Sequence, residues 1–240
     1  MQKRRLSFKF IALLAVIFGA VAAVLLSPLF RIKEIDVYGN FVITKAEILS
    51  AAQIEEGMNI FSFSSYAAAR RVDALPYARS VVIERHLPDR IVIQVVERVA
   101  IANISVAGSS TYLLIDDAGM VLRTGQTPAV HLPKIIGLNF LGFSVGEYLQ
   151  VDSAGVFEDI VFLADIFAVY DFFPDVVDFS NPRDIVMYYE NFEIDFGNME
   201  EAQRKVRYLK GITDEPPHGM DRGIIDIRDV NNHPRFRLSR

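Results

Sequence analysis

Residues 79–98 of this 240-residue chain read RSVVIERHLPDRIVIQVVER, and they decide the fold of its first half. Apolar and polar residues alternate over 79–85 and again over 90–98, as in strands with one buried face. The intervening His-Leu-Pro-Asp is a link of hairpin length. We therefore predict a β-hairpin whose second strand packs one face against helices, through these residues: Ile91, Ile93 and Val95.

The residues before this hairpin predict one strand and two helices. Residues 30–40 alternate at their centre and end at Gly-Asn, which indicates a strand and a turn. Thr44-Lys-Ala-Glu47 is a capping box, so a helix should begin there and run to about Ala52. A second helix fits 65–75, where Pro76 closes it. The order strand, helix, helix, strand, strand predicts one compact domain over 31–100.

The N-terminus predicts a membrane anchor. Phe10 to Phe30 contains no charged residue, and a helix of that length reaches about 31 Å, the thickness of a bilayer core. The preceding tail, 1–9, is basic and should stay in the cytoplasm. A cleaved signal peptide is the alternative, but it favours a shorter apolar run followed by a small-x-small site. We therefore predict an uncleaved transmembrane helix over 10–30, with everything beyond it extracytoplasmic.

Composition narrows the class of protein further. Residues 34–240 carry 19 basic against 30 acidic side chains, a net charge of −11, so nucleic acid is a poor partner. The chain has no cysteine, which excludes a disulfide scaffold and a thiolate metal site.

Residues 101–229 predict a second domain, mainly of antiparallel strands with flanking helices, before a C-terminal tail over 230–240. The predicted elements are a hairpin at 112–122, an extended piece at 132–137, an amphipathic helix at 152–173, strands at 185–189 and 192–196, a helix from Asn198 to Gly211 and a last strand at 223–228. The overall fold class is α+β.

Several motifs follow one another in a characteristic order and spacing. They are Ile32-x-x-Ile35-x-Val37-x-Gly39-Asn40, Ile43-Thr44-x-x-Glu47-Ile48, Leu75-Pro76, Arg85-x-x-Pro88-x-x-Ile91-x-Ile93-x-Val95-x-Glu97-Arg98, Leu132-Pro133-x-Ile-x-Gly137 and Ile225-Asp226-Ile227-Arg228. Together they resemble the FtsQ/DivIB family of bacterial cell-division proteins. The resemblance covers nearly the whole chain, although Val99 stands where the family often places proline. It implies a cytoplasmic tail, a single anchor, a POTRA domain and a C-terminal β domain.

The resemblance implies a scaffold of the division septum in the cell (inner) membrane, without enzyme activity, cofactor, metal or small-molecule substrate. Such a scaffold links early and late division proteins and helps control septal peptidoglycan synthesis. It binds the bitopic proteins FtsL and FtsB, or the FtsB counterpart DivIC, and the partner adds a strand beside the last strand of the β domain. The partner-binding residues implied here are Arg207, Ile225, Asp226, Ile227, Arg228, Asp229 and Phe236.

Within that set, the resemblance implies that Arg228 and Arg207 face acidic groups of the partner. One departure concerns the residues just beyond Arg228, where relatives carry aromatic side chains. This chain has Asp-Val-Asn-Asn-His-Pro-Arg there, and its only aromatic residue in that region is Phe236.

Two other classes of protein have weaker support. Gly142-Phe-Ser144-Val-Gly146 matches the nucleophile elbow of anchored serine hydrolases, but neither a helix directly after Gly146 nor an upstream oxyanion loop accompanies it. We interpret it as a connection between extended pieces. An outer-membrane POTRA transporter would need many alternating strands of about ten residues, and the chain is too short for them.

Several charged or titratable residues have ordinary structural interpretations. Glu97-Arg98 is interpreted as a weak surface ion pair. A basic group on the helix after Asn198 is either a solvated face or a partner-binding face: Arg204, Lys205 and Arg207. The histidines lack metal-ligand spacing: His86, His131, His218 and His233.

Overall fold

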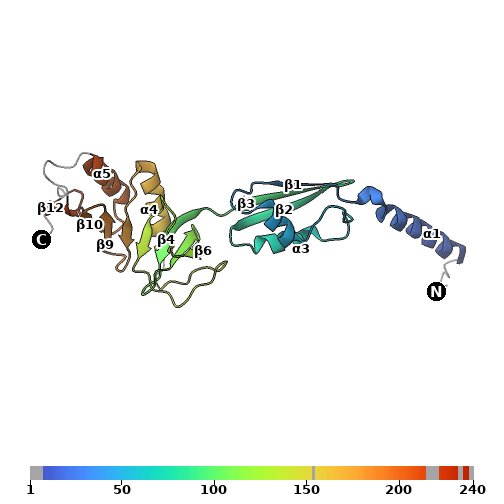
Figure 1. Cartoon of the computed structure of the whole chain (residues 1–240), viewed down its shortest axis with the longest axis horizontal. Helices are drawn as coiled ribbons and strands as arrows, with labels where there is room; N and C mark the ends of the chain where they lie inside the picture. The colour runs from blue at the N-terminus through green and yellow to red at the C-terminus, as the bar shows by residue number, and fades with distance from the viewer. Residues whose placement is uncertain (1–7, 153–154, 215–221, 232–234, 238–240) are drawn as a thin grey trace, which may run out of the picture. The chain divides into compact units, whose positions relative to one another are not determined.

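The computed structural model describes residues 8–152, 155–214, 222–231 and 235–237. The chain divides into two compact units, Met1–Arg98 and Val99–Arg240, which are coloured from blue to green and from green to red in Figure 1. Each unit is described by itself.

The N-terminal helix α1 spans Phe8–Leu25 and is shorter at its C-terminal end than predicted. Pro28 has no amide hydrogen to continue the helical ladder, and Pro28–Phe30 instead form a 3₁₀ turn. Over the part of the chain that the structure describes, no helix combines the length and the apolar composition needed to cross a bilayer.

The rest of the first unit has the predicted order of strand, helix, helix, strand, strand (Figure 1). Within its described residues the sheet has three strands in the order β1-β3-β2, with β1 parallel and β2 antiparallel to β3. Its elements are β1 (Glu34–Tyr38), α2 (Lys45–Ala52), α3 (Ser65–Asp73), β2 (Ala78–His86) and β3 (Arg90–Glu97).

The predicted capping box begins α2. The Thr44 hydroxyl accepts from the Glu47 amide at 3.2 Å, and the Glu47 carboxylate accepts from the Thr44 amide at 2.8 Å. The Thr44 hydroxyl also donates to the Glu47 carboxylate at 2.7 Å, and this bond, with the one from the Thr44 amide, holds the pKa of Glu47 below its usual value. The helix ends at Ala52, and the next residue, Gln53, caps it in a left-handed conformation with φ of 57°.

The alternation along β3 places the predicted residues in the core. Ile91 and Ile93 are fully buried and Val95 nearly so, packed against α2 and α3 in one hydrophobic cluster. Val92 points to the opposite face but is only 8% exposed. It lies in register between Asp36 of β1 and Glu84 of β2, whose side chains flank it on that face.

Glu97 has a structural role that the sequence did not indicate. Its carboxylate accepts hydrogen bonds from the amides of Val42 at 2.8 Å and Ile43 at 2.7 Å. The side chain thus fixes the loop between β1 and α2, a role beyond the surface ion pair predicted for it.

The second unit contains a mixed sheet, which confirms the α+β class. Over the residues described, it has nine strands in the order β12-β11-β10-β9-β8-β7-β4-β5-β6. The pairs β4–β7, β7–β8 and β10–β11 are parallel, and the other neighbours are antiparallel. The elements are β4 (Ala100–Ser105), β5 (Tyr112–Asp116), β6 (Val121–Gly125), β7 (Lys134–Ile136), α4 (Val156–Tyr170), β8 (Val176–Asp178), β9 (Ile185–Tyr189), β10 (Phe192–Gly197), α5 (Ala202–Asp214), β11 (Gly223–Asp226) and β12 (Arg235–Arg237).

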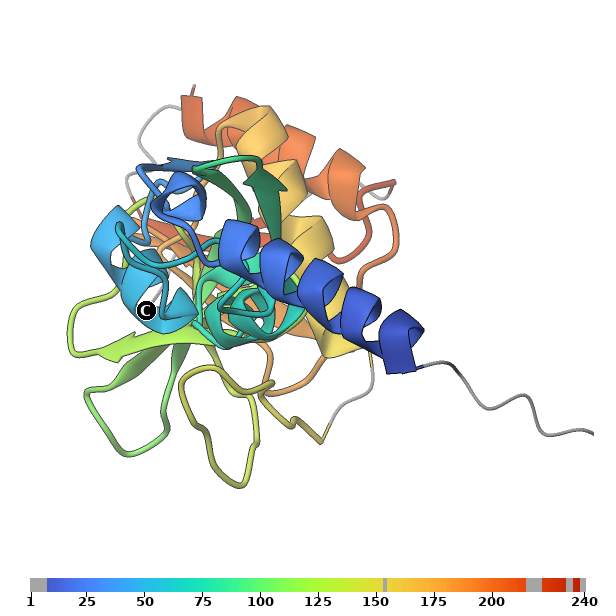
Figure 2. The ribbon, with the colours of Figure 1, turned by 90° about the vertical axis from the view of Figure 1, so that its right-hand side faces the viewer.

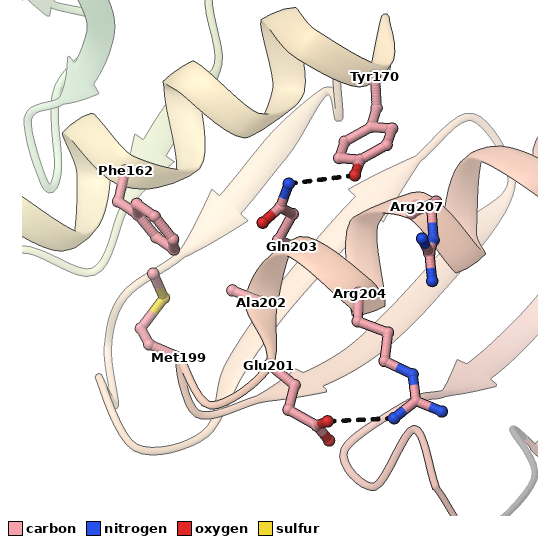
Figure 3. Close-up of a pocket in the computed structure, with 8 residues that line it drawn as sticks. All are labelled: Phe162, Tyr170, Met199, Glu201, Ala202, Gln203, Arg204 and Arg207. Atoms are coloured by element: carbon pink, nitrogen blue, oxygen red, sulfur yellow. Dashed lines mark hydrogen bonds and ion pairs between the residues drawn. The ribbon is translucent and has the colours of Figure 1, made fainter.

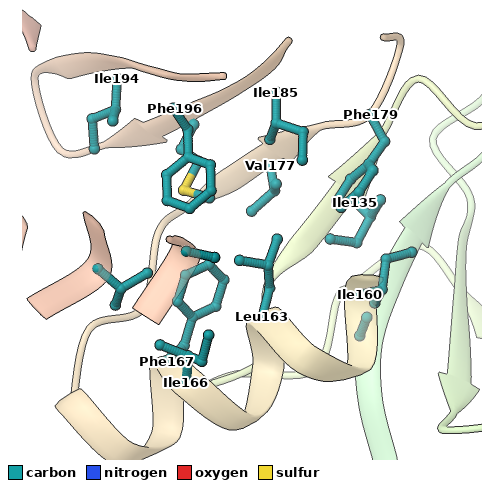
Figure 4. Close-up of a cluster of buried hydrophobic side chains, with 14 of the residues drawn as sticks. Ile135, Ile160, Leu163, Ile166, Phe167, Val177, Phe179, Ile185, Ile194 and Phe196 are labelled. Carbon is teal, nitrogen blue, oxygen red and sulfur yellow. The ribbon is translucent and has the colours of Figure 1, made fainter. Parts of the chain in front are cut away.

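Helices α4 and α5 lie next to each other and share the core of this unit (Figure 2). From α4, Leu163 and Phe167 point at Phe196 and neighbouring apolar residues of the sheet, as Figure 4 shows. This packing confirms the amphipathic pattern of the predicted helix over 152–173. The helix is shorter than predicted because Gly155 and Asp171, with φ of 80° and 51°, flank its two ends.

Helix α5 and the C-terminus differ from the prediction in two ways. Gly211 does not end α5, which continues to Asp214, because a glycine inside a helix is tolerated when packing on both sides favours the helix. Arg235–Arg237, predicted as part of a tail, form strand β12. Pro216-Pro217 lies outside the described residues.

Candidate functional site

The outermost strand on one side of the large sheet is β12, formed by Arg235–Arg237. It pairs antiparallel with β11, in the register Ile225↔Phe236 and Asp226↔Arg235. On its other side, β11 pairs with β10, and just beyond β11 the Ile227 amide donates to the Asp195 carbonyl of β10 at 3.0 Å. Strand β11 is therefore an inner strand, and the sheet edge among the described residues belongs to β12.

Two aspartates and two arginines lie together on one face of strands β10, β11 and β12. The Arg228 guanidinium donates to both carboxylate oxygens of Asp226, from Nε at 3.0 Å and from Nη2 at 2.7 Å. Arg237 donates from Nη2 to the same Asp226 Oδ2 at 2.9 Å. The Asp195 carboxylate lies 3.6 Å from Arg228 Nη2 and 3.8 Å from Arg237 Nη2. We call these four residues the edge cluster.

The strand register explains the composition of the edge cluster. Asp195 and Asp226 are direct neighbours on the parallel strands β10 and β11, and two like charges so placed repel. The two guanidinium groups offset this repulsion. Hydrogen bonds from Arg228 hold the pKa of Asp226 below its usual value, and those same bonds raise the pKa of Arg228.

Gly197, at the end of β10, allows Arg228 to lie close to the backbone. Its φ is +78°, and a Cβ atom at this position would lie 2.8 Å from Cγ of Arg228. The pairing of β10 with β9 shifts between Asp195 and Gly197. This irregularity is the point where the chain turns from the edge cluster towards α5.

Lys205 is buried, although its sequence context placed it on a basic helix face. Only 1% of its surface is exposed, and Nζ donates to the carbonyls of Phe196 and Asn198, each at 2.9 Å. Desolvation lowers its pKa. The lysine thus ties α5 to the turn after β10, and it takes no part in a surface that a partner could reach.

The two arginines of the predicted basic face line a groove between α4 and α5 (Figure 3). The groove holds about 470 Å³, and Phe162 and Tyr170 of α4 form its other wall. Arg204 donates to Glu201 at 3.1 Å and to Asn231 at 2.6 Å. Arg207 extends into the same groove, and among the described residues it has no ion-pair or hydrogen-bond partner.

The residues just after β11 connect the edge cluster with α5. The Asn231 amide donates to the Asp229 carboxylate at 3.0 Å, and the Asn231 side chain donates to Glu201 at 2.8 Å. Asp229 therefore shapes a turn.

The structure divides the seven sequence-predicted residues among different surroundings. Ile225 and Ile227 are fully buried core residues, and Phe236 is half-buried against the same core. Asp226 and Arg228 belong to the edge cluster, whereas Arg207 lies in the α4–α5 groove and Asp229 in the turn described above.

Sequence reasoning missed Asp195 and Arg237. The sequence signal for both is the alternation of apolar and charged residues along a strand. Glu193 and Asp195 point to one face of β10, and two arginines flank Phe236 in β12.

The serine motif lacks the geometry of a nucleophile elbow. Residues 141–145 form no helix or strand, and the next helix, α4, begins only at Val156. His218 and His233 lie outside the described residues. Within the described part of the chain, no group of three or more histidine and acidic side chains could hold a metal ion.

Comparisons with known proteins agree with this architecture. The family described as "POTRA domain, FtsQ-type" matches residues 30–98. The cell division protein DivIB of Clostridium tetani is 25% identical over 213 residues, which cover 85% of this chain and 78% of that protein. DivIB of Clostridium acetobutylicum is 26% identical over 208 residues, 85% of this chain and 82% of that protein. FtsQ of Corynebacterium glutamicum is 29% identical over 127 residues, 53% of this chain and 55% of that protein.

Residues 30–98 form a POTRA domain of the FtsQ type, within a two-unit α+β protein. Over 85% of its length the chain is similar to the bacterial cell division protein DivIB, and over about half of its length it is similar to the cell division protein FtsQ.

Proposed function

We propose that this chain is a non-catalytic assembly platform of the bacterial division machinery, which binds FtsL-like and FtsB- or DivIC-like partners. The observation that carries the proposal is the position of β12 at the edge of the large sheet. An edge strand presents unpaired backbone amides and carbonyls, and an extended partner segment can pair with them. Affinity would then come largely from the main chain.

The edge cluster gives this edge a preference for acidic partners. Arg228 and Arg237 are 47% and 56% exposed in their side chains, so both guanidinium groups can be reached from solvent. A carboxylate on the incoming strand would form charge-assisted hydrogen bonds with them.

The α4–α5 groove supplies a second contact. Arg207 has no internal partner among the described residues, and apolar side chains of α4 lie opposite it. A partner segment with one carboxylate and adjacent apolar side chains fits this arrangement. We place the principal contact at β12 and an auxiliary contact at Arg207.

We also propose that the uncharged stretch over 10–30 holds the protein at the cell membrane, with the two units outside the cytoplasm. The basic tail before this stretch supports that orientation. Protease added to spheroplasts should digest all but roughly the first 30 residues. A mature protein that lacks this stretch would contradict the proposal.

Co-purification from membranes tests the binding site. The full-length chain should recover its partners, and a chain lacking residues 235–240 should lose them while both units stay folded by circular dichroism. Arg228→Ala should weaken recovery without abolishing it, because the backbone ladder remains. Arg183→Ala, an exposed arginine of the same unit outside the edge cluster, is the matched control. Wild-type recovery by the truncated chain would move the site away from β12.

A further inference from the structure

We propose that Asp226 is a positioning residue, which holds Arg228 in the orientation that receives a carboxylate of the partner. The inference rests on the proposed function and concerns the same edge. Asp226 itself need not touch the partner. It acts through the guanidinium group that it holds.

The geometry of the pair leaves part of Arg228 available. A guanidinium has five N–H groups: one on Nε and two on each of Nη1 and Nη2. Asp226 engages Nε and Nη2, so it uses one side of the planar fork. No hydrogen bond from Nη1 is present among the described residues. The group can therefore keep its internal carboxylate and bind a second one at its outer end.

Asp226 also brings the second arginine to this point. Its Oδ2 atom accepts from Nη2 of both Arg228 and Arg237, at 2.7 and 2.9 Å. Two guanidinium groups that share one acceptor atom are close enough to repel each other if no carboxylate lies between them. Asp226 is itself the less exposed partner, with 16% of its side chain accessible. One shielded carboxylate thus presents two exposed cations beside the edge strand.

Positioning and simple charge predict opposite results for Asp226→Asn. The substitution removes a negative charge next to a site for an acidic partner, so charge alone would strengthen binding. If Asp226 positions Arg228, the substitution instead lets the Arg228 side chain move freely. Ordering that side chain again on binding costs free energy, so the affinity should fall. The sign of the change therefore separates the two explanations.

A double-mutant cycle tests the inference. The dissociation constant is measured for the full chain in detergent against the purified soluble domain of the FtsB- or DivIC-like partner. Asp226→Asn should weaken binding by about fivefold, which is the size of effect expected when one long side chain must be ordered on binding. In an Arg228→Ala background the same substitution should change binding less than about twofold, because its effect passes through Arg228.

A second variant keeps the test independent of the stability of Asp226→Asn. Arg228→Lys retains the charge but lacks the planar fork that can hold two carboxylates at once, so it should bind about as weakly as Arg228→Ala. Wild-type affinity in Asp226→Asn or in Arg228→Lys would overturn the inference and leave the proposed function intact. Lack of binding by the wild-type chain would overturn both.

Discussion

The Oε1 atom of Glu97, at the end of β3, lies 2.7 Å from the backbone nitrogen of Ile43, 54 positions earlier in the chain. The same carboxylate accepts from the Val42 amide. The loop between β1 and α2 thus depends on a side chain at the end of β3, the strand next to β1, and this dependence can be measured.

Replacement of Glu97 by alanine should destabilise the POTRA unit. Two backbone amides lose a charged acceptor, which costs about 1 to 3 kcal/mol in the free energy of unfolding. Urea unfolding of the full chain provides the measurement. Glu56→Ala is the control, since this exposed glutamate lies in the same unit and should change stability by less than about 0.5 kcal/mol. Equal effects of both substitutions would show that the Glu97 contacts contribute nothing.

The alternation along β3 predicts unequal costs for two positions on opposite faces of the strand. Ile93 is fully buried, so Ile93→Ala should cost about 2 to 5 kcal/mol in the free energy of unfolding. Val96 is 55% exposed on the opposite face, and Val96→Ala should cost less than about 0.5 kcal/mol. Val92 is unsuitable as the exposed control because its neighbours shield it. Similar losses in denaturant melts would contradict the observed packing of the sheet.

The POTRA elements could be predicted because their signals are local. The Thr44–Glu47 capping box fixes the start of α2 within four residues, and the alternation around Ile93 identifies the buried face of β3. Both depend on short stretches of sequence and recur in the structure with the expected contacts.

The edge cluster could be predicted only in part, because its partners come from distant strands. Arg237 meets Asp226 through the pairing of β11 with β12, and the alternation around Phe236 does not show which strand β12 pairs with. Lys205 looked like a surface residue, yet two carbonyls of the preceding turn satisfy its ammonium group inside the unit. In both cases, contacts between residues of different elements determine where the side chain lies.

The Asp226–Arg228 pair should make the stability of the second unit depend on pH at the acid end. The folded-state pKa of Asp226 is depressed, so its contribution is present above the unfolded value of about 4 and is lost as pH falls through the lower folded pKa. Wild type should therefore exceed Asp226→Asn in unfolding free energy at pH 7. The difference should shrink towards pH 2. A difference that stays constant over this range would mean that the carboxylate's charge contributes no stability.

Two adjacent proline substitutions test whether β11 is an inner strand. The Ile227 amide donates to the Asp195 carbonyl at 3.0 Å, so Ile227→Pro removes a ladder hydrogen bond beside the core and should unfold the second unit. Among the described residues, the Arg228 amide donates only to the Asp226 side chain, at 3.3 Å, outside the ladder. Arg228→Pro should therefore leave the unit folded while it removes the guanidinium group from the edge cluster.

Circular dichroism and partner recovery together distinguish the two variants. Ile227→Pro should lose the cooperative unfolding of the second unit and the partner, while the POTRA unit keeps its own transition. Arg228→Pro should keep both transitions and recover less partner, to about the extent of Arg228→Ala, because β12 still offers its backbone. If Arg228→Pro unfolded the unit and Ile227→Pro did not, the amide of Arg228 would be the inward one. The register of β10, β11 and β12 would then have to be reassigned.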